Sequence, residues 1–305
     1  MVAVALSTQP VALAARQRRW RLLLPAECWH LLSLDAPTVA ALWAWSIGRA
    51  AHVAISADSL LLLFLGTWLL YVADRLLDGV HQDSARLRER HLFYRRHRVA
   101  AMAAAVPVAA VLGWLVVLHM LDRARRADLV LFALAAAYFA LVHLRGPAIE
   151  RWFPKELLVG LIAATAIAVP AWSRTTLSKS GAIFVVFIAL FASVCWLNCV
   201  AIEKWERPRS ALVRGAPIVD PTTRWGQRRL RRIGAAIAVV AIFGAGAFLG
   251  LGNAAAAALC LAGAASAALL ALLDVAHARG GISAFHLRIA ADVALLTPLL
   301  LVIFR

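Results

Sequence analysis

Charged residues are scarce in this chain, and acidic residues are the scarcest of them. Asp, Glu, Lys and Arg together make up 16% of the 305 residues, whereas roughly 25% is usual in soluble domains. Hydrophobic residues make up 63%, against roughly 45–50% in soluble proteins. This composition excludes a water-soluble globule.

Cysteine is also rare, and the four cysteines show no CxxC spacing. The sequence therefore indicates neither a disulfide framework nor a thiolate metal site. The phosphate-binding GxxxxGK[ST] and GxGxxG loops, the GxSxG nucleophile elbow and the HExxH zinc motif are all absent. These absences argue against the nucleotide-binding, serine-hydrolase and zinc-protease classes that depend on those motifs.

Long apolar runs are what the chain has in their place. Runs of about 20 residues, enough to cross roughly 30 Å of hydrocarbon, recur along the whole sequence. We predict an all-α polytopic membrane protein of about nine transmembrane helices. The expected spans are 36–54, 59–77, 99–121, 127–144, 156–172, 181–203, 233–251, 254–275 and 285–304. They form a single transmembrane domain over 36–305, and residues 1–35 are expected to form an amphipathic segment lying in the membrane interface.

The formal charge of +16 bears on how the chain is oriented in the membrane. The basic residues fall in short loops beside the predicted spans, where they set orientation and contact anionic lipid rather than nucleic acid. If the N-terminus is cytoplasmic, about 25 of the 32 Lys and Arg residues lie inside. We therefore expect a cytoplasmic N-terminus, a location in the bacterial inner membrane, and an active site that faces the cytoplasm.

Acidic residues concentrate where the second and sixth spans end. A carboxylate within the membrane is unfavourable and often marks a functional site. Residues three or four apart share a helix face, and this spacing places two acids on each of two stripes: Tyr71, Asp74 and Asp78 on one, and Cys199, Glu203 and Glu206 on the other. Like charges at that spacing repel unless a cation bridges them, and such oxygen ligands suit Mg²⁺.

Other interpretations of the charged residues stay open. The acids equally fit surface ion pairs that neutralise neighbouring arginines, and Asp274 and Asp292 fit helix-end or packing contacts as well as catalysis. Arg86, Arg88 and Arg90 are typical topology determinants, yet arginine is also how a diphosphate is clamped. Lys155 is the most specific basic residue because it stands at the start of the fifth span.

Nine spans with acidic motifs ending the second and the sixth resemble the UbiA superfamily of intramembrane prenyltransferases. The first signature of that family reads N-D-x-x-D-x-x-x-D. In this chain its last two acids are kept as Asp74 and Asp78, while Leu70 and Tyr71 replace the leading Asn-Asp pair. The chain is thus similar to a divergent member of the family with a degenerate first motif.

The second half of the resemblance lies at the sixth span. Glu203 and Glu206 stand where the family usually has aspartates, and Asn198 lies upstream of them. Lys155 resembles the basic residue that family members place against the diphosphate. The segment from Arg86 through Arg88 to Arg90 falls where the family carries a basic loop.

The resemblance implies a substrate and a mechanism. Its acids would hold Mg²⁺ on an isoprenoid diphosphate, and the allylic group would pass to a lipophilic acceptor, which is expected to be aromatic. Trp68, Tyr71 and Asn198 would line the pocket. One alternative is a membrane terpene cyclase, in which the substrate's own double bonds capture the cation. The other is a non-catalytic transporter or scaffold, although transport sites tend to lie near the bilayer midplane and these acids do not.

Overall fold

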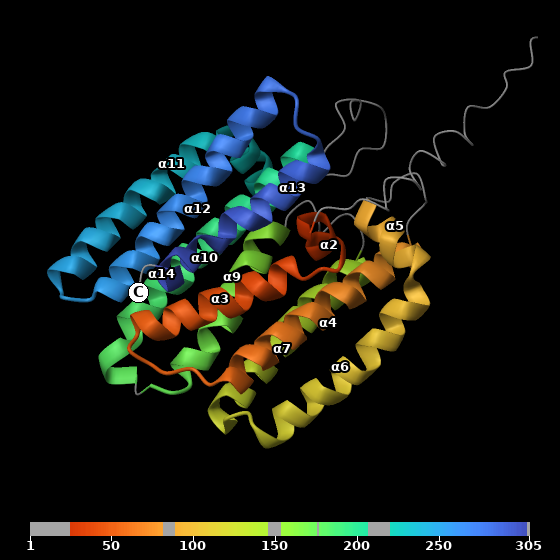
Figure 1. Cartoon of the computed structure of the whole chain (residues 1–305), viewed down its shortest axis with the longest axis horizontal. Coiled ribbons are helices and arrows are strands. Elements are labelled where there is room, and N and C mark those ends of the chain that lie inside the picture. Colours follow the sequence, from red (N-terminus) through yellow and green to blue (C-terminus); the bar gives the residue numbers. More distant parts are fainter. Residues whose placement is uncertain (1–24, 82–88, 146–153, 176, 207–219, 304–305) are drawn as a thin grey trace, which may run out of the picture.

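The computed structural model describes residues 25–81, 89–145, 154–175, 177–206 and 220–303, and every regular element in those ranges is helical (Figure 1). In chain order they are α2 (Pro25–Leu31), α3 (Asp35–Ala50), α4 (Ala57–His81), α5 (Glu89–Arg96), α6 (Arg98–Leu118), α7 (Asp122–Arg145), α9 (Lys155–Trp172), α10 (Leu177–Glu206), α11 (Pro221–Gly250), α12 (Ala254–Arg279), α13 (Ala284–Val293), the 3₁₀ helix η2 (Ala294–Leu299) and α14 (Leu300–Ile303).

Five of the described helical segments are long and apolar enough to cross a membrane: Ala57–Leu77, Arg98–Leu118, Gly181–Glu206, Pro221–Gly250 and Ala254–Arg279. Helices also occupy the other predicted spans, as α3, α7, α9 and the run from α13 to α14. The prediction of an all-helical, membrane-embedded protein is confirmed at this level. The count of nine spans and the side of the N-terminus stay predictions.

Local sequence explains where several helices begin and end. α11 begins about three turns before the predicted apolar span, because the Asp220 side chain accepts hydrogen bonds from two backbone N–H groups of the first turn, and Pro221 occupies the first helical position. Gly280 and Gly281 separate α12 from α13. Their φ angles of 79° and 95° lie in the region that glycine adopts without strain.

α10 forms the centre of the bundle. It packs against α9, α11, α12 and α13, with α11 and α12 on one flank and α4 and α6 on the other (Figure 1). Phe187, Phe191 and Leu197 of α10 are fully buried, and so is Trp43 of α3. Close approach of α9 requires Gly160, because a Cβ there would lie 3.0 Å from a backbone oxygen of α10. The middle of the bundle is therefore an apolar, closely packed core.

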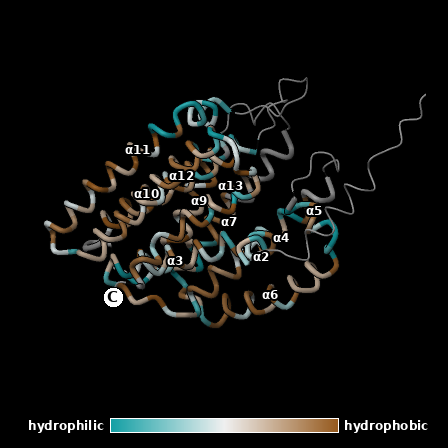
Figure 2. The backbone as a smooth tube through the Cα atoms, turned by 45° about the horizontal axis from the view of Figure 1, so that its top comes forward, coloured by the Kyte–Doolittle hydropathy of each residue, from teal (hydrophilic) through white to brown (hydrophobic). Residues whose placement is uncertain are grey.

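Polar residues occupy both ends of this apolar bundle. Figure 2 shows hydrophilic segments at α5 and near the start of α11, which lie at the end where α10 stops. At one end, which carries the starts of α4 and α7, Asp58 contacts His119 at 2.9 Å and Arg174 donates to Ser59 at 2.7 Å. We call this the far end. The other end carries the start of α3 and the last turn of α10, and it contains most of the buried charge.

Only part of the predicted interfacial segment 1–35 can be placed, since residues 1–24 lie outside the described residues. The rest forms α2 and the turn into α3. His30 and Leu31 are buried, and His286 of α13 contacts Glu27 at 3.2 Å. Residues 25–35 therefore pack onto the bundle.

Candidate functional site

Polar side chains from four helices in three separate regions of the sequence meet at the end of the bundle where α3 begins. We call them the polar cluster, and its members are His30, Asp35, Asn198, Glu206, Arg288 and Asp292. They come from α2, α3, α10 and α13. Because contacts join residues up to 262 positions apart, the fold itself builds this cluster, and no local motif does.

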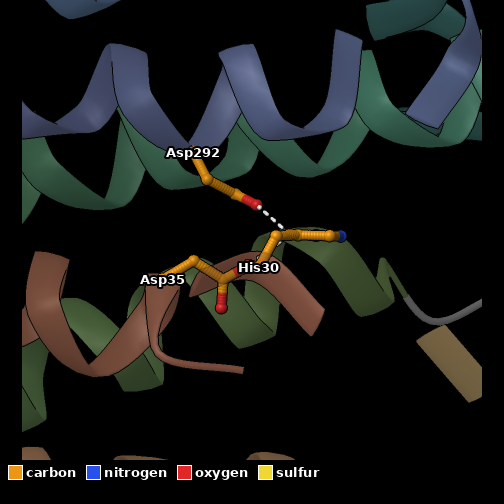
Figure 3. Close-up of side chains that lie close together, drawn as sticks. All are labelled: His30, Asp35 and Asp292. Carbon is orange, nitrogen blue, oxygen red and sulfur yellow. Dashed lines mark hydrogen bonds and ion pairs between the residues drawn. The ribbon is translucent and has the colours of Figure 1, made fainter. Parts of the chain in front are cut away.

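His30 forms the centre of the polar cluster. Its Nδ1 lies 2.7 Å from Asp35 Oδ2 and 3.3 Å from Asp292 Oδ2. Figure 3 shows His30 between α3, which carries Asp35, and α13, which carries Asp292. His30 is 2% exposed, so these contacts form away from water.

The two carboxylates raise the pKa of His30. Burial by itself lowers the pKa of the imidazole, because it disfavours the charged form. Hydrogen bonds to Asp292 and Asp35 outweigh burial and leave the pKa of His30 raised above its usual value.

The outer oxygens of both carboxylates are held in place by separate donors. The backbone N–H of Ala36 donates to Asp35 Oδ1 at 2.9 Å, and Asn198 Nδ2 donates to Asp292 Oδ1 at 3.4 Å. Each acid therefore keeps its Oδ2 directed at the same point beside His30. One turn before Asp292 on α13, Arg288 pairs with Glu206 at 2.9 Å.

The end of α4 presents an arginine and an aromatic ring to the neighbourhood of the cluster. Arg75 is buried, stacks over the Tyr71 ring at 5.2 Å and pairs with the preceding Asp74. The Asp74 side chain is 42% exposed. Tyr71 is within electrostatic range of Asp35 and Cys199, so this stretch of α4 faces α3 and α10.

An apolar groove runs between α3 and α4 and reaches the neighbourhood of the polar cluster. Its volume is about 530 Å³, and its lining residues are Thr38, Ala41, Leu42, Trp45, Leu60, Phe64 and Leu299. Thr38 stands one turn beyond Asp35 on α3. On α4, Phe64 lies two turns before Tyr71 and on the same face, because seven residues are close to two helical turns.

The predicted site residues are only partly placed. Arg86 and Arg88 lie outside the described residues, and so do the side chains of Asp78 and Lys155, which stand in the last turn of α4 and at the start of α9. Arg90 is buried beside His91. Trp68 donates from Nε1 to the backbone oxygen of Leu32 at 3.0 Å.

The two predicted pairs of acids have different surroundings. Asp74 is paired with Arg75, and Glu206 is paired with Arg288. Glu203 lies in the last turn of α10 with its side chain partly exposed. Asn198, predicted to line the pocket, is buried within the polar cluster. Whether the two pairs share a metal ion stays a prediction.

Asp274 lies apart from the polar cluster and has a structural role. Its carboxylate accepts hydrogen bonds from Lys204 at 2.7 Å, Arg231 at 2.9 Å and Trp205 at 3.1 Å. These partners come from the last turn of α10 and from α11, while Asp274 lies in α12. The contact thus ties three helices together, in agreement with the packing interpretation rather than the catalytic one.

Sequence reasoning missed His30 and Asp35. The available signal was an acid at the first residue of an apolar helix, preceded by a histidine in a segment rich in tryptophan and leucine. For their partner Asp292, the sequence favours a packing contact as much as catalysis. Nothing local joins it to His30, because the two residues meet only in the folded bundle.

No family model, no curated protein and no solved structure matches this chain. The described helices and the polar cluster define an all-helical, membrane-embedded protein that gathers buried charge at one end of an apolar bundle.

Proposed function

We propose that the protein is a Mg²⁺-dependent intramembrane prenyltransferase, which moves an isoprenoid group from its diphosphate to a lipophilic, aromatic acceptor. In this proposal the chain crosses the bacterial inner membrane nine times, its N-terminus is cytoplasmic, and the polar cluster faces the cytoplasm. Two features support the proposal: the UbiA-like motifs at Asp74 and Glu203, and the apolar groove beside the polar cluster.

The observation that carries the proposal is the apolar groove next to the polar cluster. Asp35, Thr38, Leu42 and Trp45 are three or four residues apart and lie on one face of α3. At a rise of about 1.5 Å per residue, this face extends about 15 Å from Asp35 to Trp45. A groove that is apolar along its length and charged beyond its end suits an amphiphile with a hydrocarbon chain and an ionic head.

The charged residues near the groove suit the diphosphate. In the proposed reaction the bond between the allylic carbon and the diphosphate oxygen breaks, and the bonding electron pair leaves with the diphosphate. Arg75 and Arg288, with Lys155 and the Arg86–Arg90 loop, would stabilise that charge. The faces of Tyr71 and Trp68 would stabilise the allylic cation. The acceptor then forms the new carbon bond and loses a proton.

A divalent ion fits the acids that end α4 and α10. Their carboxylates are hard oxygen ligands of the kind that Mg²⁺ prefers, and Asp74 is partly exposed toward solvent, so a metal–diphosphate complex can reach it. The residues that would hold the ion are Asp74, Asp78, Glu203 and Glu206. When bound, Mg²⁺ would neutralise charge that develops on the leaving diphosphate.

Labelled geranyl, farnesyl and geranylgeranyl diphosphates test the proposal with the purified protein in lipid nanodiscs. We expect Mg²⁺-dependent release of diphosphate and a prenylated product when aromatic acceptors are present. Asp78→Asn and Glu206→Gln should each lower the rate by at least about 100-fold, because metal-held charge stabilisation of this kind contributes several kcal/mol.

Asp122→Asn serves as the matched control, because this acid lies at the far end and its side chain is 78% exposed. Its rate should equal that of the wild type. A folded protein that releases no diphosphate from any donor would refute the proposal. A cyclic hydrocarbon formed without an acceptor would replace transfer by cyclisation, and solute movement across liposomes would favour a transporter.

A further inference from the structure

We infer that His30, Asp35 and Asp292 form a second divalent-cation site, selective for a transition metal such as Mn²⁺ or Zn²⁺, that joins α2, α3 and α13. The inference does not depend on prenyl transfer, because it rests on this cluster alone. Its three ligand atoms lie within 4.8 Å of one another.

Distances between the ligand atoms suit a coordination sphere. Nδ1 of His30 lies 2.7 and 3.3 Å from the Oδ2 atoms of Asp35 and Asp292. Metal–ligand bonds of about 2.1 Å place neighbouring ligands of an octahedron about 3 Å apart. An ion can therefore be bound with small side-chain shifts, because three ligands from three helices already point at one place.

The surroundings of the ligands are those of a built site. Ala36 N–H and Asn198 Nδ2 hold the outer oxygens of the two acids, in the way that neighbouring groups orient metal ligands. Asn198 is 8% exposed, and its Oδ1 has no hydrogen-bond partner in the described part of the chain. This buried amide is directed at Asp292 through its Nδ2.

The mixed donor set decides which metal is favoured. Imidazole nitrogen suits zinc and other transition metals, whereas Mg²⁺ prefers oxygen ligands alone. Charge also favours a divalent ion, since the two carboxylates, one buried and one 16% exposed, balance it fully. The nearest cation on the same helix, Arg288, is already paired with Glu206 at 2.9 Å, which reduces its repulsion of a metal.

Mn²⁺ titration of the purified, chelator-treated protein in nanodiscs tests the inference, with free Mn²⁺ followed by electron paramagnetic resonance. We expect one saturable site of this kind that Zn²⁺ competes for and excess Mg²⁺ does not, together with a rise in Tm on Mn²⁺ addition. Asp292→Asn and His30→Gln should each abolish it. Asn198→Ala should weaken it about 10–100-fold, as is typical when an orienting group is lost.

The Asp58–His119 pair provides the matched control. It also joins a carboxylate to an imidazole, at 2.9 Å, but it is exposed and lies at the far end. Asp58→Asn should leave Mn²⁺ affinity unchanged. Circular dichroism identifies variants that fail to fold. If Asp292→Asn and His30→Gln fail to fold, Asn198→Ala still tests the site, because it keeps all three ligands. Absence of saturable Mn²⁺ binding by the wild type, or equal affinity in Asp292→Asn, would show that the cluster is an internal ion pair.

Discussion

Replacing Asp274 by asparagine should destabilise the protein although the substitution keeps the shape of the side chain. Asp274 is 1% exposed and accepts from Lys204, Arg231 and Trp205. Asparagine removes the charge and turns an N–H₂ group toward these donors. α10 and α11 then lose the acceptor on α12 that both of them contact.

The size of the effect follows from the exposure of the partners. A hydrogen bond to a charged group contributes about 1.5–3 kcal/mol, but the Lys204 and Arg231 side chains are 31% and 50% exposed. Water and salt screen such pairs, so each contributes less than about 1 kcal/mol. The buried Trp205 N–H also loses its charged acceptor. We therefore expect the free energy of unfolding to fall by about 2–3 kcal/mol in total.

Thermal unfolding of the detergent-purified protein, followed by intrinsic tryptophan fluorescence at a fixed scan rate, measures the effect. On the scale of about 2–4 °C per kcal/mol for larger domains, Tm should fall by about 4–12 °C. Asp122→Asn is the control, because this exposed acid pairs only within its own helix turn at 3.2 Å, and its Tm should stay within about 2 °C. Equal Tm values for both variants would refute the structural role given to Asp274.

Three further substitutions test the packing and the groove. Gly160→Ala should lower the free energy of unfolding by about 1–3 kcal/mol, since the added Cβ would press against the backbone of α10. Gly113→Ala should be neutral in the same unfolding assay, because the Cβ added there would have no atom within 4 Å. Trp43→Phe should cost about 1–3 kcal/mol by leaving a buried carbonyl without its donor. Ala41→Trp should fill the groove and reduce prenyl-diphosphate binding, measured by labelled-ligand filtration, while Val106→Trp, on an exposed face of α6, should not; equal binding by the two would argue against the groove.

Much of the fold could be predicted because spans have a local signal. Residues 254–275 were expected to form a span, and α12 covers Ala254–Arg279. The start of α11 could not be placed this way, because its first turns are basic and polar and depend on the cap at Asp220. Hydropathy finds the membrane-crossing part of a helix, while caps decide where the helix begins.

The candidate site was less predictable, for a physical reason. The spacing of Tyr71, Asp74 and Asp78 identifies a helix face, but it does not show that Arg75 turns inward and pairs with Asp74. The contact between His30 and Asp292 has no sequence signal at all. It depends on how α2 and α13 pack, which hydropathy and spacing do not determine.

The helices differ sharply in the share of their residues that the bundle buries. In the apolar windows of α10 and α12, 56% of the residues are buried, against 11% in α4 and 6% in α6. Moving α4 outward therefore disrupts far less packing than moving α10 does. The apolar groove between α3 and α4 lies beside this weakly buried helix. In the proposed function, a lipophilic substrate would therefore enter the groove sideways from the bilayer without first passing through water.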